Sequence, residues 1–270
     1  MFLKMNVMVF GAYGMLGQYV CRYFKLKGVK VKGYGRDDFD IYQMFLENEL
    51  YDLLDTIIPE DIVVINCAGI TNKRQEVSLS EMYIVNSIFP MMLDKLCHTK
   101  HTHLIHISTD CVFSGKEGNY IMTDFPDETN NYGMSKNFGE RLDHSMVIRT
   151  SIIGEEKTQH PLGLLEWVKN NKDEHIKGYT NHLWNGVTCL ELAKFIYERI
   201  TQNKLWNGIV HIVSETITKY DLVKLILETY DIKKDVEPFQ TDNKCDKTLI
   251  GIKINKSLKE QMNELKDFNI

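Results

Sequence analysis

The sequence predicts an α/β fold in which a doubly wound parallel sheet carries a smaller C-terminal lobe. Along residues 1–154, short apolar runs rich in β-branched residues alternate with helical patterns, which indicates at least six strands separated by helices. The first run, residues 6–10, opens directly on a glycine-rich turn, and the run at 104–107 ends in polar and reactive side chains. Both features occur where an open α/β sheet presents its strand ends to a ligand.

The composition is typical of a soluble globular protein. The chain has 270 residues, 43% hydrophobic and 26% charged, with a formal charge of −5. This charge argues against a surface that coats nucleic acid. We expect no membrane span, because uninterrupted apolar runs of the required length are absent. The N-terminal apolar residues lead into the glycines without a cleavage site and are interpreted as a strand, not a signal peptide.

The cysteines and histidines do not predict a metal site. The six cysteines are scattered without a CxxC pair, which indicates reduced thiols in a cytoplasmic protein. Four histidines cluster at a loop–strand junction but lack a carboxylate or cysteine companion at ligand spacing. They are His98, His101, His103 and His106.

The glycine-rich turn is the first candidate binding element. Gly11, Gly14 and Gly17 follow a strand and open the helical pattern QYVCRYFKLKG. Glycines at this spacing allow a tight turn and close approach of the backbone to a pyrophosphate, and the helix N-terminus supplies amide donors. The turn therefore predicts a Rossmann-type dinucleotide site, with a plain strand–helix turn as the alternative. We expect three further residues of this turn to contact the cofactor: Tyr13, Met15 and Leu16.

The second strand, VKVKGYG, ends at Arg36-Asp37-Asp38. An arginine at this position can accept the extra phosphate of NADP, whereas a carboxylate bonds the ribose diol of NAD. Because Arg36 comes first, NADP(H) is the preferred cofactor, and the two aspartates keep NAD(H) possible. A solvated loop charge is the alternative interpretation of Arg36.

The apolar run 61–71 predicts a buried strand that ends in small residues. Cys67, Ala68 and Gly69 would let the cofactor lie against the strand end, and Cys67 is also typical of a small core residue. The following helical pattern, 80–97, carries Asn86 within an apolar face. A buried amide needs hydrogen-bond partners, so Asn86 either organises the site or is satisfied structurally.

The segment 104–136 carries the candidate chemistry. The strand LIHI ends at Ser108-Thr109-Asp110-Cys111, and a helix begins near Tyr132-Gly-Met-Ser-Lys136. The spacing of four places Tyr132 and Lys136 on one helix face. An ammonium beside a phenol favours the phenolate, and the hydroxyl of Thr109 could hold the same carbonyl oxygen. Together these residues predict hydride addition or removal at a carbonyl.

After the strand predicted at 145–154, the regular alternation loosens. Helices are expected at ELAKFIYERI and KYDLVKLILETY, with a strand at GIVHIVS between them. We predict an NADP-binding domain formed by residues 1–154 plus about 186–213. We predict a nucleotide-binding substrate lobe formed by about 155–185 plus 214–270.

The motifs GAYGMLG, NCAG, STDCVFSG and YGMSK, with RTS at 149–151 and the later GxxHxxS, occur together in this order. With them, the chain resembles the extended short-chain dehydrogenase/reductases, and among these the dTDP-4-dehydrorhamnose reductases. The resemblance covers essentially the whole chain. It implies NAD(P)H-dependent reduction of a nucleotide-linked 4-keto-6-deoxyhexose, with Thr109, Tyr132 and Lys136 as the catalytic residues.

The same resemblance implies sugar contacts at Asp110 and Cys111. A cysteine at this position departs from the tyrosine usual in rhamnose reductases and resembles related epimerase/reductases, in which it serves as acid or base. His160 matches the partner histidine of such enzymes. A thiol and an imidazole titrate within reach of neutral pH, so epimerisation at carbon 3 or 5 is expected with the reduction. Trp184, in a polar turn of the predicted lobe, is expected to contact the base or ribose.

Several alternatives stay open. The chain could be a reductase only, an epimerase or dehydratase without net redox change, or a non-catalytic NADP-binding regulatory subunit. The substrate nucleotide could be UDP, dTDP or GDP, and Cys111 favours UDP. A homodimer is usual for this fold, and neither nucleic acid nor membrane is expected as a partner.

Overall fold

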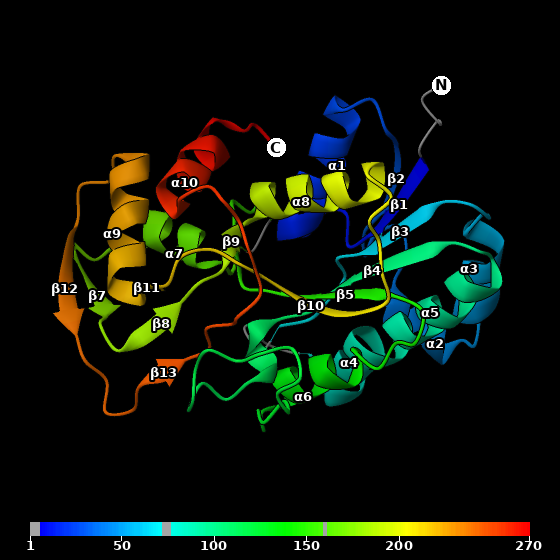
Figure 1. The fold of residues 1–270 in the computed structure, drawn as a ribbon, viewed down its shortest axis with the longest axis horizontal. Helices are drawn as coiled ribbons and strands as arrows, with labels where there is room; N and C mark the ends of the chain where they lie inside the picture. The colour runs from blue at the N-terminus through cyan, green and yellow to red at the C-terminus, as the bar shows by residue number, and fades with distance from the viewer. Residues whose placement is uncertain (1–5, 72–76, 159–160) are drawn as a thin grey trace.

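The computed structural model describes residues 6–71, 77–158 and 161–270. At its centre is a seven-stranded sheet in the spatial order β14-β10-β5-β4-β3-β1-β2, and all six pairings between neighbours are parallel (Figure 1). The strands are β1 (Asn6–Phe10), β2 (Lys30–Tyr34), β3 (Val63–Asn66), β4 (His103–Ile107), β5 (Met146–Arg149), β10 (Gly208–Val213) and β14 (Ile252–Lys253). The predicted doubly wound parallel sheet is confirmed.

The order of the strands creates a switch point in the sheet. From β1 the chain first adds β2 on one side and then β3 on the other. The connections that leave β1 and β3 therefore diverge to opposite faces, and a crevice opens at the carboxyl ends of these two strands. The glycine turn follows β1, and the small residues at 67–69 follow β3, so both predicted binding elements lie at this crevice.

The strands are buried on both faces, and their side chains alternate between two apolar clusters. On β1, Val7 and Val9 belong to one cluster, whereas Met8 and Phe10 belong to the other. The same period of two divides the residues of β3, β4 and β5. Such continuous apolar runs are typical of parallel strands covered by helices on each side, which explains why they were recognisable in the sequence.

Helices cover both faces of the sheet. One face carries α1 (Met15–Leu26) and α8 (Cys189–Thr201), which lie side by side. The other face carries most of the remaining helices of the first half of the chain (Figure 1). They are α2 (Ile41–Leu46), α3 (Leu50–Ile57), α4 (Leu79–Tyr83), α5 (Phe89–Thr99) and α6 (Asn131–Phe138).

The helix predicted at 80–97 is interrupted by a π-helical turn over Ile84–Ile88. Pro90 cannot donate a backbone hydrogen bond to the carbonyl of Asn86, and its ring would clash with that carbonyl in a regular helix. A wider turn relieves the clash. The freed carbonyl of Asn86 lies against Gly139, where an added β-carbon would overlap it. The irregular turn thus lets α6 approach closely.

The helix predicted near Tyr132 is α6, which ends at Phe138 and is followed by Gly139. The strand predicted at 145–154 is split. Its second part, β6 (Ile152–Ile153), leaves the main sheet and pairs with β9 (Val187–Thr188).

The smaller lobe lies at one end of the molecule and contains two small sheets (Figure 1). One sheet has the order β11-β8-β13, and the other pairs β12 with β7. Its elements are α7 (Leu164–Asn170), β7 (His175–Tyr179), β8 (His182–Trp184), β11 (Ile217–Thr218), α9 (Lys219–Tyr230), β12 (Asp235–Phe239) and β13 (Cys245–Asp246).

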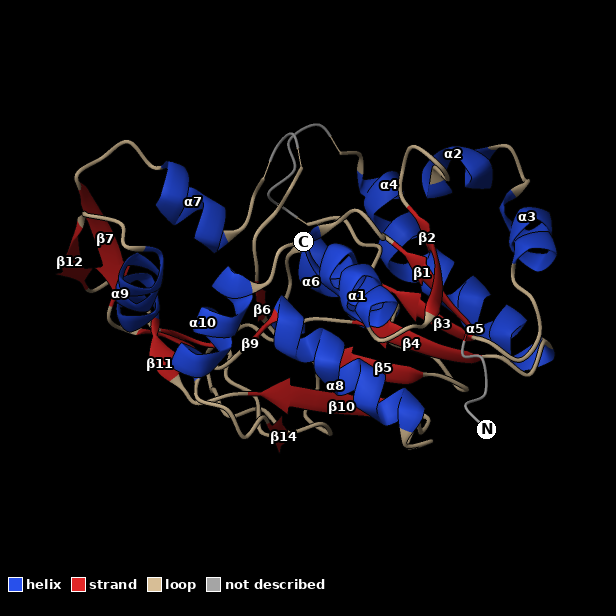
Figure 2. Ribbon diagram, turned by 90° about the horizontal axis from the view of Figure 1, so that it is seen from above, coloured by secondary structure: helices blue, strands red, loops and turns tan. Residues whose placement is uncertain are grey.

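The assignment of 214–270 to this lobe was wrong for its last part. Strand β14 pairs with β10 and forms one edge of the main sheet (Figure 2). The final helix, α10 (Leu258–Asp267), packs against both α8 and α9. The C-terminal segment thus bridges the two parts of the molecule. None of the helices in the described residues is both long and apolar enough to span a bilayer.

Candidate active site

The glycine turn has the geometry that a dinucleotide requires. Gly11 has a positive φ of 73°, and a β-carbon there would run into the backbone of Cys67 and Ala68. A β-carbon on Gly17 would overlap the carbonyl oxygen of Gly11. Gly14 is the N-cap residue of α1 and has no side chain to bond the first amides of the helix. These amides and the helix dipole favour a bound anion, so the turn fits the pyrophosphate of NAD(P).

The end of β2 lies beside this turn. The ring of Tyr13 covers Gly35, and its hydroxyl bonds the carboxylate of Asp38, which raises the pKa of the phenol. Asp38 also accepts a hydrogen bond from the Gly35 amide at 3.0 Å. Arg36 follows directly, with half of its side chain exposed, and forms ion pairs with Asp40 and Glu81. The predicted phosphate-binding arginine therefore lies at the expected strand end, among carboxylates.

The small residues after β3 connect the glycine turn with the candidate catalytic residues. Cys67 and Ala68 contact Gly11 as described, and burial raises the pKa of the Cys67 thiol. At Gly69, an added β-carbon would lie 3.4 Å from Oδ1 of Asn86 and 3.9 Å from Nζ of Lys136. This strand end thus forms a continuous small-residue surface from the turn to the lysine.

Asn86 is fully buried and every polar atom of its side chain is bonded. Its Nδ2 donates to the carbonyl of Ile70 at 2.9 Å and to Oγ of Ser135 at 3.0 Å, and its Oδ1 accepts from the Ile70 amide at 2.8 Å. The side chain therefore fixes the segment after β3 against α6. The side chain is thus structurally satisfied, and it also links the segment after β3 to the helix that carries Tyr132 and Lys136.

Lys136 is buried, and its Nζ donates to the carbonyl oxygen of Ile107 at 2.8 Å. Burial lowers the pKa of this lysine to about 8, against the opposing effect of the Glu140 carboxylate. Glu140 itself forms a buried ion pair with Arg149, Nη2 to Oε2 at 2.7 Å, and accepts a hydrogen bond from Ser108. This buried pair was absent from the sequence prediction.

Thr109 and Tyr132 meet at the end of β4. Their hydroxyls are hydrogen-bonded, which lowers the pKa of the phenol. Burial has the larger effect and, together with the nearby Cys111 and Asp110, raises the pKa of Tyr132 above its usual value. We expected the lysine to make the phenol easier to deprotonate, and in the structure burial outweighs any such effect. The phenol is therefore protonated at neutral pH.

Cys111 lies next to this pair, and its amide donates to Oγ1 of Thr109 at 3.1 Å. Burial, reinforced by Asp110, raises the pKa of the thiol to about 12, although Lys247 opposes the shift. The expectation that this thiol titrates near neutral pH was therefore wrong. Asp110 is buried too, and burial raises its pKa against the attraction of Lys219 and Lys247.

Two lysines from the smaller lobe therefore act on the candidate site, and neither was predicted. Lys247 forms an ion pair with Glu128 at 2.8 Å. Lys219 lies with Nζ 5.1 Å from the ring centroid of Trp184. No local pattern marks either lysine, because the residues that each one contacts are distant in the sequence.

Two further residues, Trp184 and His160, were predicted to act in the site. Trp184 is only 4% exposed, and its indole Nε1 donates to Oγ of Ser151 at 2.8 Å, so the indole packs against the segment that follows β5. His160 lies outside the described residues. Within those residues, no group of three or more His, Cys, Asp and Glu side chains is arranged to hold a metal ion.

Comparison with known proteins supports the resemblance seen in the motifs. Residues 5–248 match the family described as RmlD substrate binding domain. A dTDP-4-dehydrorhamnose reductase of Aggregatibacter actinomycetemcomitans is 27% identical over 247 residues, covering 86% of this chain and 81% of the relative. The methionine adenosyltransferase 2 subunit beta of Danio rerio is 28% identical over 254 residues, covering 84% and 74%.

The fold is shared with solved structures. The dTDP-4-dehydrorhamnose reductase of Bacillus anthracis, solved in complex with NADP, superposes with a TM-score of 0.83 at 19% identity, covering 98% of this chain and 99% of that one. The family match over residues 5–248 assigns the chain to one family, and the doubly wound sheet agrees with that assignment. The chain belongs to the RmlD substrate binding domain family, with the fold of the extended short-chain dehydrogenase/reductases.

Proposed function

We propose that this protein is an NADPH-dependent reductase of the carbon-4 ketone of a nucleotide-linked 4-keto-6-deoxyhexose. The observation that carries the proposal is the hydrogen-bonded pair of Thr109 and Tyr132, one helical turn from Lys136 and at the same sheet edge as the glycine turn. The names of the relatives agree with it, because a reductase of this type matches most of the chain.

Each residue has a task that follows from its surroundings. Burial keeps the Tyr132 phenol protonated, so that it can donate a proton to the ketone oxygen as that oxygen becomes an alkoxide. Thr109 orients the same oxygen through its hydroxyl. The Lys136 ammonium, charged below about pH 8, adds positive charge beside the developing alkoxide and would hold the nicotinamide ribose. Bound NADPH would supply the hydride.

Residues of the glycine turn and the strand ends would hold the cofactor. The α1 N-terminus fits the pyrophosphate, Arg36 fits the adenosine 2′-phosphate, and Gly69 leaves room for the nicotinamide ribose beside Lys136. Because Arg36 follows the second strand, we propose a preference for NADP(H) with NAD(H) as a weaker alternative.

We propose a dTDP-linked sugar as the first substrate to test, because a relative that matches 86% of the chain is a dTDP-4-dehydrorhamnose reductase. A UDP-linked sugar is the second choice, and its support is the cysteine at position 111. Lys219 and Lys247 are the cationic side chains that act on Asp110, and they would attract the diphosphate of either nucleotide. A homodimer in the cytoplasm remains part of the proposal.

Epimerisation at carbon 3 or 5 is a second candidate activity. The Cys111 thiol lies close enough to Tyr132 to raise the pKa of the phenol, so it borders the proposed carbonyl site. Its own pKa of about 12 limits the thiolate available as a base at neutral pH. Reduction is therefore proposed as the main activity.

The test is consumption of NADPH by the full-length protein with a panel of dTDP- and UDP-linked 4-keto-6-deoxy sugars, followed by identification of the product. Oxidation of NADPH with formation of a 4-hydroxy sugar is expected. Isomerisation of the sugar without NADPH consumption would instead identify an epimerase. Binding of NADPH without turnover on any sugar would favour a regulatory subunit, the alternative suggested by the adenosyltransferase subunit relative.

A further inference from the structure

We propose that Glu81 sets the cofactor preference of this chain by holding the guanidinium of Arg36 and so weakening its attraction for the 2′-phosphate of NADP(H). This inference rests on the proposed NADP(H)-binding function, and it concerns a residue 45 positions away in the sequence. Glu81 belongs to α4, on the connection that follows β3, whereas Arg36 follows β2. The switch point of the sheet brings the two together.

The guanidinium of Arg36 is engaged on two of its three nitrogens. Nη2 pairs with Oε1 of Glu81, and Nε lies 3.5 Å from Oδ2 of Asp40. A phosphate binds arginine most strongly through two parallel N–H donors. Nε and Nη2 form one bidentate edge of the guanidinium, and both are directed at carboxylates. A 2′-phosphate that uses this edge has to displace at least one of them.

The two carboxylates differ in how they are held. Asp40 is the N-cap of α2 and accepts a hydrogen bond from the Gln43 amide at 3.0 Å, so it has a structural task besides the ion pair. The Glu81 side chain is only 13% exposed, against 50% for Arg36. Glu81 is thus a fixed anion, and Arg36 is the partner that a ligand can reach.

A second helix of the same chain shows the conformation that such a glutamate otherwise adopts. The sequence Ser78-Leu-Ser-Glu81 opens α4, and Ser257-Leu-Lys-Glu260 opens α10. In α10 the Glu260 carboxylate turns back to its own cap and accepts from the Ser257 amide at 2.8 Å. In α4 the equivalent carboxylate reaches across to Arg36. The difference indicates that the arginine draws Glu81 toward the cofactor side of the helix.

The charges around Arg36 affect the binding of NADP(H) and of NAD(H) differently. One guanidinium charge is offset by the carboxylates of Asp40 and Glu81, and a phosphomonoester brings about two further negative charges at neutral pH. Like charges brought together without compensation oppose binding. NAD(H) has a hydroxyl at this position and escapes the repulsion. Glu81 therefore disfavours NADP(H) selectively and keeps NAD(H) competitive.

The experiment measures dissociation constants of NADPH and NADH for the full-length wild type and for Glu81→Gln and Glu81→Ala. Both variants are expected to bind NADPH about five- to tenfold more tightly, with the dissociation constant of NADH unchanged within about twofold. The same shift is expected with 2′,5′-ADP as the probe and not with 5′-AMP. High salt should reduce the shift, because both charges are near the surface.

The matched control is Glu47→Gln, which removes one carboxylate at the C-cap of α2, where it accepts a hydrogen bond from Gln43. This variant should leave the ratio of the two dissociation constants unchanged. In an Arg36→Ala background, Glu81→Gln should also have no effect, because the glutamate acts through the arginine. A thermal melt of each variant verifies that it is folded.

Three outcomes would overturn the inference: an unchanged ratio in both Glu81 variants, an equal gain for NADPH and NADH, or a full effect that persists without Arg36. These results differ from a failure of the proposed function. Failure of cofactor binding would leave the wild type without affinity for NADPH or NADH, whatever residue is present at position 81. Failure of reduction alone would leave both dissociation constants measurable, without turnover on any sugar.

Discussion

Lys136 donates from Nζ to the carbonyl oxygen of Ile107 at 2.8 Å, so the ammonium on α6 is tied to the last residue of β4. Thr109 follows Ile107 by two residues, and its hydroxyl meets that of Tyr132. One strand end therefore positions all three proposed catalytic groups. Their relative placement depends on how α6 packs against β4, and not only on the segment that connects them in the sequence.

The rate of reduction should fall as the pH rises through about 8. Burial lowers the pKa of Lys136 to about 8, so the side chain is an ammonium below that pH and neutral above it. The phenol of Tyr132 stays protonated over the same range, because its pKa is raised. A profile of kcat/KM against pH should thus show one descending limb near 8. A profile that stays flat to about pH 10 would contradict this role of the lysine.

Tyr132→Phe should abolish reduction without affecting cofactor binding. Removal of a positioned proton donor typically lowers the rate about 10²- to 10⁴-fold, whereas the glycine turn that holds the pyrophosphate is unchanged. Single-turnover rates and NADPH titrations measure the two effects. Tyr51→Phe is the control, since Tyr51 is exposed on α3. Full activity of the Tyr132 variant would refute the assigned role.

Gly17→Ala should weaken both the fold and cofactor binding. The new β-carbon would overlap the carbonyl oxygen of Gly11, so α1 would have to move away from β1. Overpacking of this kind costs about 1–3 kcal/mol, and displacement of the α1 N-terminus removes the pyrophosphate site. Urea unfolding and NADPH titration test the two effects.

The comparison for that variant is Gly28→Ala. No heavy atom lies within 4 Å of the β-carbon that would be added at Gly28, although its φ of 77° makes the backbone strained for alanine. This strain costs about 1 kcal/mol, and NADPH binding should be retained. Equal loss of NADPH binding in both variants would show that the close approach at Gly17 is unimportant.

Any epimerisation through Cys111 should depend steeply on pH. With a thiol pKa of about 12, the thiolate fraction at neutral pH is small and grows about tenfold for each unit of pH. In heavy water, deuterium at carbon 3 or 5 of the sugar should thus accumulate faster at alkaline pH and disappear in Cys111→Ser. Absence of deuterium in the wild type would restrict the activity to reduction. Its persistence in the variant would assign the base to another residue.

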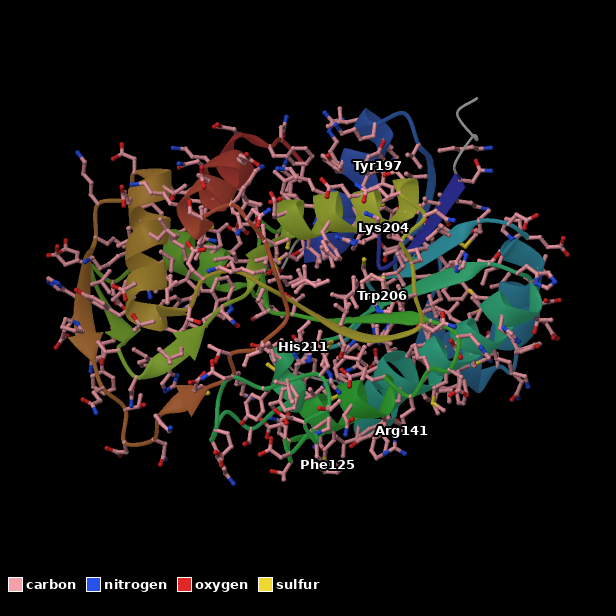
Figure 3. The ribbon with its side chains drawn as sticks, viewed as in Figure 1. Phe125, Arg141, Tyr197, Lys204, Trp206 and His211 are labelled. Atoms are coloured by element: carbon pink, nitrogen blue, oxygen red, sulfur yellow. The ribbon has the colours of Figure 1, made fainter. Side chains whose placement is uncertain are left out.

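The stability of the fold should decrease on acidification because of His211. This residue lies on β10 near the middle of the molecule (Figure 3), where burial and then Arg149 lower the pKa of the imidazole from 6.5 to about 4. The folded state therefore favours the neutral ring, and the unfolded chain takes up the proton first. The resulting stabilisation is complete above pH 6.5 and is lost as the pH falls to about 4.

Urea unfolding between these two pH values measures the effect. In His211→Gln the free energy of unfolding should fall less on acidification, because the variant lacks the imidazole that the unfolded wild type protonates first. An identical pH dependence in the variant would show that the imidazole titrates normally. Above pH 6.5 the variant is expected to be less stable than the wild type, because Nδ1 of His211 is hydrogen-bonded to the carbonyl of Ile250 at 3.1 Å.

Much of the fold could be predicted because its signals are local. Each central strand is an apolar run whose residues alternate between two faces, and the turn after β1 needs glycine for reasons of backbone geometry. The spacing of Tyr132 and Lys136 places them on one helix face wherever that helix lies. Errors arose where tertiary contacts override local pattern, as at β6, at the π-helical turn and at β14.

The sequence by itself determined the doubly wound sheet and the dinucleotide turn, because periodicity and glycine spacing act over a few residues. It also singled out Thr109, Tyr132 and Lys136 as candidate catalytic residues. Only the tertiary structure decided the charges around them. The pairs of Glu140 with Arg149, Glu81 with Arg36 and Glu128 with Lys247 join elements that are far apart in the chain or on different helices and strands. Burial, which sets the protonation of Tyr132, Cys111 and Lys136, likewise arises only when those elements pack together.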